Sequence, residues 1–310
     1  MIGLLEKIYV SHTGEEIDLS ALSFDELQQL NLEEETFFAR EIEKKPSFSK
    51  EREQFSRRAN QQIFQIADWK RRETKQVGNG VRDQTVELLK RVIEKSAAKG
   101  GPISFYEAGV GKADAIRQLA GENIAIRGCD IFLSDEAREL QKKDTPRLDL
   151  VEENLYDALD RIEDRSVDVF YADNVLEHIV SDEFEATCKK IADKIKVKGT
   201  AVFIIPNAYV GPSDISKIAR PIGSKATGFH FMEQSFEENL KTFHKYGLEP
   251  RYLCWRDRDL KTIHCVRDVL ALNALKKRAE KYFGKIANAR MRRRVFKQMA
   301  YEVYVLEKRR

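Results

Sequence analysis

The sequence has few of the features that define disulfide-rich, secreted or membrane proteins. Its 310 residues include four cysteines, scattered at Cys129, Cys188, Cys254 and Cys265, and none belongs to a Cys-x-x-Cys pair. This scatter favours a reducing, cytoplasmic location over a disulfide framework. No stretch approaches the about 18 uncharged apolar residues of a membrane helix, and the N-terminus lacks the basic region and apolar run of a secretion signal. We therefore expect neither a membrane span nor secretion.

Composition and charge indicate one main domain with additions. A hydrophobic content of 42% over 310 residues suffices for one α/β domain plus about 100 residues of additions. The net charge of +3 conceals two opposite segments, since Glu15–Glu43 holds ten acids and one base and Lys276–Lys297 holds ten bases and one acid. Such segments either dock on each other or bind separate partners.

The residues from Ile103 to Ala120 predict a strand, a glycine turn and a helix. Gly109 and Gly111 let the backbone turn sharply and approach a ligand, and the following helix begins with free N–H groups, so the unit is typical of a nucleotide cradle. A dinucleotide fingerprint would place a third glycine where Asp114 stands. Glu107, just before the turn, suits a cationic ligand better than a diphosphate.

The pattern Glu-x-Gly-x-Gly, followed by a strand ending in Asp130, resembles the first two motifs of the class I S-adenosylmethionine-dependent methyltransferases. The resemblance implies S-adenosylmethionine as the cofactor, with Glu107, Gly109 and Gly111 in its cradle. Asp130 lies 19 residues after Gly111, a spacing at which an acid accepts hydrogen bonds from a ribose diol. The alternative role for Asp130 is to cap the helix that begins near Ser134.

A second motif, Ser166–Ile179, resembles the fourth-strand motif of the same family and is the more specific of the two. Asp168 would open the strand, Asp173 and Asn174 would lie at its carboxyl end facing the ligand, and His178 would lie on the first turn of the next helix.

The strand predicted at Leu148–Val151 bears on adenine binding. In the family that the chain resembles, an acid and a backbone amide just after this strand contact the adenine. Glu152 or Glu153 with Asn154 are therefore candidates, the alternative being an acidic surface turn.

The resemblance also implies the fold: an α/β, Rossmann-like, seven-stranded and mostly parallel sheet with an antiparallel last strand. Strands at Thr200–Ile205, Leu248–Trp255 and Tyr301–Glu307 fit its second half. We expect a helical extension over residues 1–80 and a methyltransferase domain over 81–310, with an active-site lid at 208–234 and a basic helical insertion at 256–299. The extension either packs on the domain or, near Trp69–Arg82, covers the cofactor.

The expected reaction is methyl transfer to an oxygen or nitrogen of a small-molecule or glycan-linked acceptor. A hydroxyl acceptor would gain about 10²–10⁴-fold from a positioned base, and His178 and His230 are the candidates. The alternative is that His178 orients the cofactor and that His230 is structural. No set of His, Cys and carboxylate side chains shows the sequence spacing of a metal site, so no metal is expected.

Other acceptors and other functions stay open. The basic segment Lys276–Lys297, with interleaved aromatics, could bind phosphates of RNA, DNA or lipid headgroups. The Asn/Asp-Pro-Pro-Tyr/Phe box of enzymes that methylate base amines is absent, which counts against base N-methylation. A non-catalytic scaffold would be expected to lose the cradle, and Asp114 disfavours a nicotinamide dehydrogenase.

Overall fold

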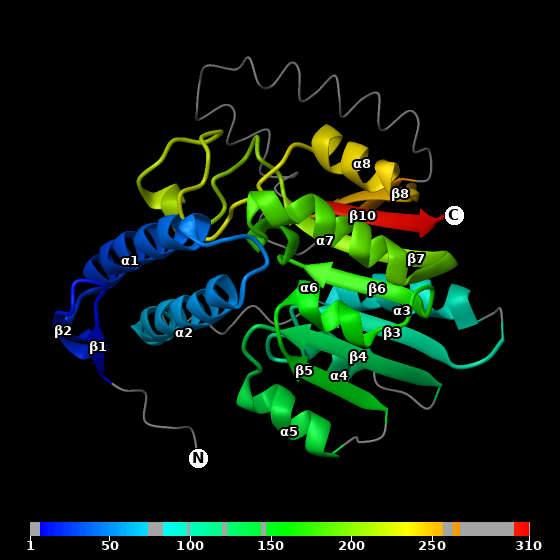
Figure 1. The fold of residues 1–310 in the computed structure, drawn as a ribbon, viewed down its shortest axis with the longest axis horizontal. Helices are drawn as coiled ribbons and strands as arrows, with labels where there is room; N and C mark the ends of the chain where they lie inside the picture. Colours follow the sequence, from blue (N-terminus) through cyan, green and yellow to red (C-terminus); the bar gives the residue numbers. More distant parts are fainter. Residues whose placement is uncertain are drawn as a thin grey trace.

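A computed structural model describes residues 7–73, 83–97, 100–119, 123–143, 147–256, 263–266 and 301–309. Its centre is an eight-stranded sheet in the order β5-β4-β3-β6-β7-β10-β8-β9 (Figure 1). The strands are β3 (Ile103–Ala108), β4 (Ile124–Asp130), β5 (Leu148–Glu152), β6 (Val167–Asp173), β7 (Ile195–Pro206), β8 (Leu248–Arg256), β9 (Ile263–Val266) and β10 (Tyr301–Lys308).

The strand order confirms the predicted class I fold. The five strands from β5 to β7 pair in parallel, and β10 lies antiparallel between β7 and β8. The sheet has one strand more than predicted, because β9 pairs antiparallel with β8 at the edge. This strand falls inside the insertion expected to be helical at 256–299, so that expectation is wrong for Ile263–Val266. Residues 257–262 and 267–299 of the insertion, including Lys276–Lys297, lie outside the described residues.

Helices cover both faces of the sheet, so the central strands are apolar on both faces, as parallel strands usually are. Phe105 and Tyr171 pack on one face and Tyr106 and Phe170 on the other. The first face is covered by α3 (Asp83–Ala97), α4 (Asp114–Leu119) and α5 (Asp135–Lys143), and the second by α6 (Leu155–Ala158), α7 (Ser181–Lys194) and α8 (Phe236–Lys245). Short 3₁₀ helices are η1 (Leu19–Ala21), η2 (Leu159–Arg161), η3 (Leu176–His178) and η4 (Ile215–Ile218).

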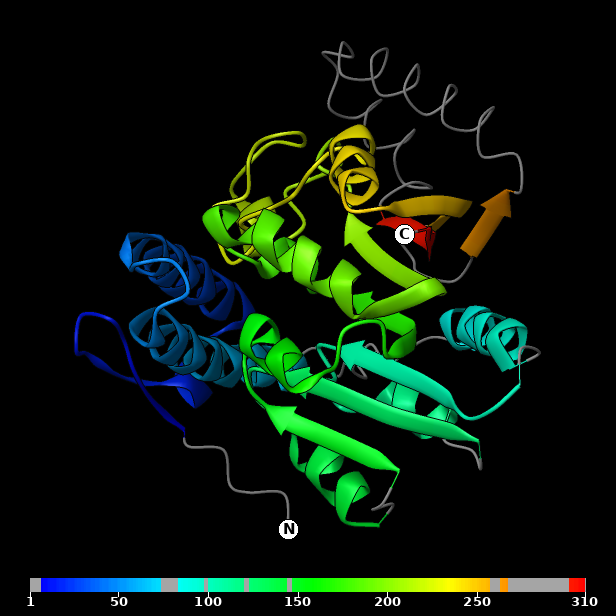
Figure 2. The same ribbon diagram turned by 45° about the vertical axis from the view of Figure 1, so that its right-hand side comes forward.

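The N-terminal extension is helical, as expected, but begins with an unpredicted hairpin of β1 (Ile8–Val10) and β2 (Glu16–Asp18). The helix α1 (Phe24–Lys44) starts at a capping box of Ser23 and Glu26. It ends just before Pro46, and α2 (Lys50–Glu73) follows. Figures 1 and 2 show both helices beside the carboxyl ends of the parallel strands, where ligands of such sheets bind.

The extension shares a hydrophobic core with the rest of the chain. Leu27 and Phe38 of α1 and Ile66 of α2 pack in one cluster with Val180 and Phe229, which come from beyond the fourth strand. The extension therefore packs on the domain and is not an independent unit. None of the helices within the described ranges is long and apolar enough to cross a membrane.

Candidate cofactor and acceptor site

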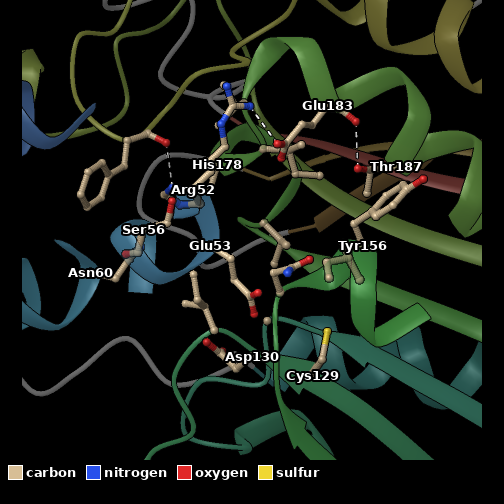
Figure 3. A pocket seen from close by; sticks show the side chains of 18 of the residues that line it. Arg52, Glu53, Ser56, Asn60, Cys129, Asp130, Tyr156, His178, Glu183 and Thr187 are labelled. Carbon is tan, nitrogen blue, oxygen red and sulfur yellow. Dashed lines mark hydrogen bonds and ion pairs between the residues drawn. The ribbon is translucent and has the colours of Figure 1, made fainter. Parts of the chain in front are cut away.

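A cavity of about 330 Å³ lies between α2 and the carboxyl ends of the parallel strands. In Figure 3, Ser56 and Asn60 of α2 face the space that His178 borders on one side and Asp130 on the other. The lining includes Ser56, Asn60 and Phe64 from α2, Gly109, Asp130, Glu153, Asn154, Asp173, Asn174 and His178 from the strand ends, and Phe229 and Phe231 from the segment 208–234. Its volume is in the usual range for small-molecule sites.

The two glycines of the turn after β3 have different surroundings. Both have positive φ, +72° at Gly109 and +52° at Gly111, a conformation that favours glycine. A Cβ on Gly109 would lie 2.3 Å from Val175 Cγ2, whereas a Cβ on Gly111 would meet nothing within 4 Å. Gly109 thus permits close packing against the loop after β6, and Gly111 faces open space.

Glu107 lies beneath this turn and is almost fully buried, at 3% exposure. Its Oε2 atom has no hydrogen-bond partner among the described residues. Burial, together with the negative charges of Asp173 and Asp130, raises the pKa of Glu107 well above its usual value. A buried acid surrounded by acids favours a cationic group nearby, although Glu107 itself does not line the cavity.

Asp130 ends β4 and holds the glycine turn. Its Oδ2 accepts a hydrogen bond from the Gly111 amide at 2.8 Å, and its Oδ1 accepts one from the Phe132 amide at 3.1 Å. Burial raises the pKa of Asp130, and these amides oppose the rise. The cap of α5 is instead Ser134, whose Oγ accepts from the Ala137 amide. Asp130 therefore does not cap that helix.

The two acids after β5 have different positions. Glu152 does not line the cavity, because its carboxylate accepts from the Leu133 amide and pairs with Arg138 and with Arg57 of α2. Glu153 lines the cavity and pairs with Arg161 at 2.8 Å. Asn154, also in the lining, caps α6 by accepting from the Asp157 amide. Of the adenine candidates, Glu153 and Asn154 are placed to contact a ligand.

The carboxyl end of β6 brings Asp173 and Asn174 to the cavity wall, while Asp168 lies at the other end of the strand. Asn174 has a positive φ of +54°, which asparagine tolerates, and its Nδ2 donates to Asp173 Oδ1 at 2.8 Å. Asp168 accepts from the Ser104 amide and from Lys196. Its role is to connect neighbouring strands.

The two candidate histidines are in contact with each other. His178 lies on η3, the short helix directly after β6, and its Nδ1 donates a hydrogen bond to the Phe229 carbonyl at 3.0 Å. Nδ1 of His230 bonds to Glu233 Oε1 at 2.6 Å, and the two imidazole centroids are 4.7 Å apart. His178 lines the cavity, and His230 lies behind it.

The surroundings of the two histidines shift their pKa values in opposite directions. The protein packed around the imidazole and the nearby His230 together lower the pKa of His178 to about 3, although its side chain is open to the cavity, so His178 is neutral at pH 7. Burial also opposes protonation of His230, but its bond to Glu233 and the charge of Glu177 raise its pKa overall.

Glu177 completes this group, and sequence reasoning missed it. Its carboxylate is fully buried, neither oxygen has a hydrogen-bond partner among the described residues, and burial raises its pKa to about 8. One ligand atom each of Glu177, His178 and His230 lies within 4.8 Å of the others. The search of the sequence for closely spaced metal ligands did not find this group, because His230 is 52 residues from His178. The sequence feature that could have identified Glu177 is its position directly before His178 in the motif Ser166–Ile179.

The segment 208–234 connects this group to α1. Glu35 of α1 accepts a hydrogen bond from the Phe229 amide at 2.9 Å, and Asp214 accepts one from the Gly228 amide at 2.8 Å. Burial raises the pKa of Glu35 to about 7. Among the described residues, Ser56, Asn60 and Phe64 of α2 line the cavity at the strand ends. Of the expected cover at Trp69–Arg82, residues 74–82 lie outside the described residues.

Part of the chain matches a known protein family. Residues 106–203 match a family model described as a methyltransferase domain. No curated protein matches the sequence. A Burkholderia thailandensis 1,6-didemethyltoxoflavin-N1-methyltransferase structure, solved with S-adenosylhomocysteine, is 12% identical over 73% of this chain and 79% of that one, with a TM-score of 0.46. An S-adenosylmethionine-dependent methyltransferase from Archaeoglobus fulgidus is 16% identical over 74% and 95%, with a TM-score of 0.48.

The matched residues begin on β3 and end on β7, so they contain the glycine turn, Asp130 and the fourth-strand motif. Residues 106–203 therefore form a methyltransferase domain, as the two motifs predicted.

Proposed function

We propose that this protein transfers the methyl group of S-adenosylmethionine to a hydroxyl oxygen of a small-molecule or sugar-linked acceptor. The observation that carries the proposal is the cluster of Glu177, His178 and His230, which reaches the cavity through His178. An amine acceptor reacts once it is held in line with the sulfonium, whereas a hydroxyl must also lose its proton. The cluster supplies groups that act on such a proton.

In this proposal the cofactor lies across the carboxyl ends of β3, β4 and β6. The buried, unpartnered oxygen of Glu107 and the open space at Gly111 support a cationic ligand that approaches the turn closely. Asp130 would accept hydrogen bonds from the ribose hydroxyls. The proposed contacts are Glu107, Gly109, Gly111 and Asp130 around the methionine and ribose parts, Glu153 and Asn154 at the adenine, and Asp173 and Asn174 beside the transferred methyl.

The reaction is an in-line displacement. The bond between the methyl carbon and the sulfonium sulfur breaks as the new carbon–oxygen bond forms, and the sulfur keeps the electron pair. The hydroxyl proton leaves the acceptor toward the histidine pair. Because the pKa of His178 is lowered while Glu233 makes His230 more basic, His230 is the proposed base and His178 is the group that contacts the substrate hydroxyl.

The test has two stages. Calorimetric titration with S-adenosylmethionine, S-adenosylhomocysteine and NAD should show binding of the two adenosyl ligands alone. Transfer of a labelled methyl group is then measured on paired panels of hydroxyl-bearing and amine-bearing small molecules and sugars. Labelling of hydroxyl acceptors, reduced by His230→Gln, supports the proposal, whereas labelling restricted to amines overturns it.

The nucleic-acid alternative depends on Lys276–Lys297, which lie outside the described residues. If that segment binds nucleic acid, affinity should fall steeply with salt and in a variant with Arg292, Arg293 and Arg294 changed to alanine.

A further inference from the structure

The cluster of Glu177, His178 and His230 has the chemistry of a metal site. Each histidine uses its Nδ1 in a hydrogen bond, to the Phe229 carbonyl or to Glu233, which leaves each Nε2 as the lone-pair atom. Histidines that bind metals are typically oriented in this way, by a carbonyl or carboxylate on the other ring nitrogen. Both rings are thus fixed in the tautomer that a metal ion requires.

Glu177 supplies an independent reason to expect a cation. It is 0% exposed, and neither of its oxygens has a hydrogen-bond partner in the part of the chain that the structure describes. A buried carboxylate without partners is costly, so such groups are normally paired or coordinate a metal. The charged groups that act most strongly on it are His230, Asp173 and Glu233, two acids against one histidine. The charge around Glu177 is therefore net negative, which favours a doubly charged cation.

We propose that Glu177, His178 and His230 bind a divalent transition-metal ion such as Zn²⁺ or Co²⁺, through one Glu177 oxygen and the two Nε2 atoms. Two imidazoles and one carboxylate form the ligand set of catalytic sites that keep a position open, and imidazole favours transition metals over Mg²⁺. One potential ligand atom of each residue, a ring nitrogen or a carboxylate oxygen, lies within 4.8 Å of the other two. Ligands of a tetrahedral ion at about 2.0–2.2 Å lie about 3.4 Å apart, so small side-chain shifts complete the site.

The residues around the cluster connect the proposed ion to the segment 208–234 and to the cavity. Glu233, which orients His230, also accepts a hydrogen bond from the Ser213 amide, so the site joins η3 to the segment 208–234. His178 borders the cavity, so an open coordination position there faces the acceptor. This step rests on the proposed function, in which His230 acts as the base of the metal-free site; a bound ion would replace His230 in activating the hydroxyl. It would bind the acceptor oxygen as an alkoxide, whose proton is released to solvent before the methyl transfer.

Metal titration of the full chain tests the site without reference to activity. Chelator-treated protein is titrated with Co²⁺, followed by visible absorption, and then with Zn²⁺ as competitor. We expect one equivalent of Co²⁺ with tetrahedral or five-coordinate bands, displaced by Zn²⁺. Glu177→Gln and His230→Gln should each weaken binding by at least about 100-fold, beyond the loss typical of an outer-shell change.

The matched control is His244→Gln, because His244 is an exposed histidine, also hydrogen-bonded through Nδ1 to a glutamate, on α8. It should leave Co²⁺ binding unchanged. Circular dichroism and S-adenosylhomocysteine affinity establish that each variant is folded. Absence of Co²⁺ and Zn²⁺ binding in the wild type, or unchanged binding in folded Glu177→Gln, overturns the proposal.

The same experiments separate this proposal from the proposed function. If the ion binds through these residues but only amines are methylated, the metal site stands and hydroxyl transfer fails. If hydroxyl acceptors are methylated at full rate by chelator-treated protein that binds no Co²⁺, hydroxyl transfer stands and the metal site fails.

Discussion

At the scale of single residues, we expect substitutions of the two glycines after β3 to differ in their effects on stability and on ligand binding. Gly111→Ala should cost about 1–2 kcal/mol of stability, because only the positive φ opposes it. Under the proposed function it should also greatly weaken S-adenosylhomocysteine binding, because its Cβ would enter the open space that the cofactor is proposed to occupy. Gly109→Ala should cost about 1–3 kcal/mol more, since its Cβ would meet Val175. Urea denaturation and calorimetry measure both effects. Equal destabilisation, or full affinity in Gly111→Ala, would contradict the assignment.

Asp130 provides a second residue-scale prediction. Asp130→Ala should weaken cofactor binding by about 1.5–3 kcal/mol, the range for hydrogen bonds to a charged group. Asp135→Ala, an exposed acid on the neighbouring helix, is the control and should leave binding unchanged. Calorimetric titration with S-adenosylhomocysteine checks both. The ribose assignment is wrong if folded Asp130→Ala binds as tightly as the wild type.

Sequence and structure agree at residues whose role is set by local neighbours. Gly109, Gly111 and Asp130 lie within the strand–turn–helix–strand unit from β3 to β4, so their spacing predicted that they would lie at the same edge of the sheet. The partners of Glu152 did not follow from spacing, because Arg57 comes from α2. Glu177 was missed for the same reason: its neighbour His230 arrives on a distant segment.

At the scale of elements, Arg52 attaches α2 to α7. It is 4% exposed and bonds Asp182, Glu183 and the carbonyls of Glu43 and Lys45. Arg52→Ala should lower the free energy of unfolding by about 2–4 kcal/mol, because two carboxylates and two carbonyls lose their donor. Hydrogen exchange should rise most along α2.

The control for Arg52 is Arg91→Ala, which breaks an exposed pair with Glu87 on α3. An exposed pair contributes about 0.2–1 kcal/mol at most. Equal losses from the two substitutions would show that Arg52 does not anchor the helix.

Glu35, on α1, makes stability depend on pH. Its pKa in the folded state is about 7, above the usual value, so the folded state holds its proton more tightly than the unfolded state. This contribution is complete below about pH 4 and is lost as the pH rises through 7, by up to about 3 kcal/mol. Glu35→Gln should remove that loss, so the variant gains stability over the wild type between pH 5 and pH 8. Urea denaturation at both values checks this, and a difference that does not change with pH would contradict it.

Element boundaries were predictable where apolar spacing was regular. The strand predicted at Thr200–Ile205 is longer, because β7 begins at Ile195 and passes through polar residues and Lys198, which has a positive φ of +65°. The short strands β1 and β2 have three residues each, too few for a period to appear in the sequence. Tertiary pairing, not local preference, creates these parts.

At the scale of the whole molecule, residues from the N-terminal extension, the strand ends and the segment 208–234 line one cavity. Saturation with S-adenosylhomocysteine at 100 times its dissociation constant should stabilise the protein by about 2.7 kcal/mol. It should also slow hydrogen exchange in the glycine turn and in α2 together, since both line the cavity. Exchange and thermal unfolding measure these effects, with NAD as the inactive control. Slowing confined to the glycine turn would show that α2 does not enclose the ligand.

The overall fold was predictable because seven strands and their order follow from apolar segments and family-like motifs. The cavity wall that α2 adds was not predictable, because all of its cavity residues except Phe64 are polar and gave no sign of burial in the sequence. Ser56 and Asn60 gain their place only from the packing of α2 beside the strand ends.

The core shared by the N-terminal helices and Phe229 has a consequence during synthesis. Ile66 leaves the ribosome 163 residues before Phe229, which at 5–20 residues per second is a delay of roughly 10–30 s. During that delay the cluster formed by α1 and α2 lacks the cover that Phe229 supplies. We therefore expect the nascent chain to expose part of this apolar surface to chaperones until the segment 208–234 has been translated.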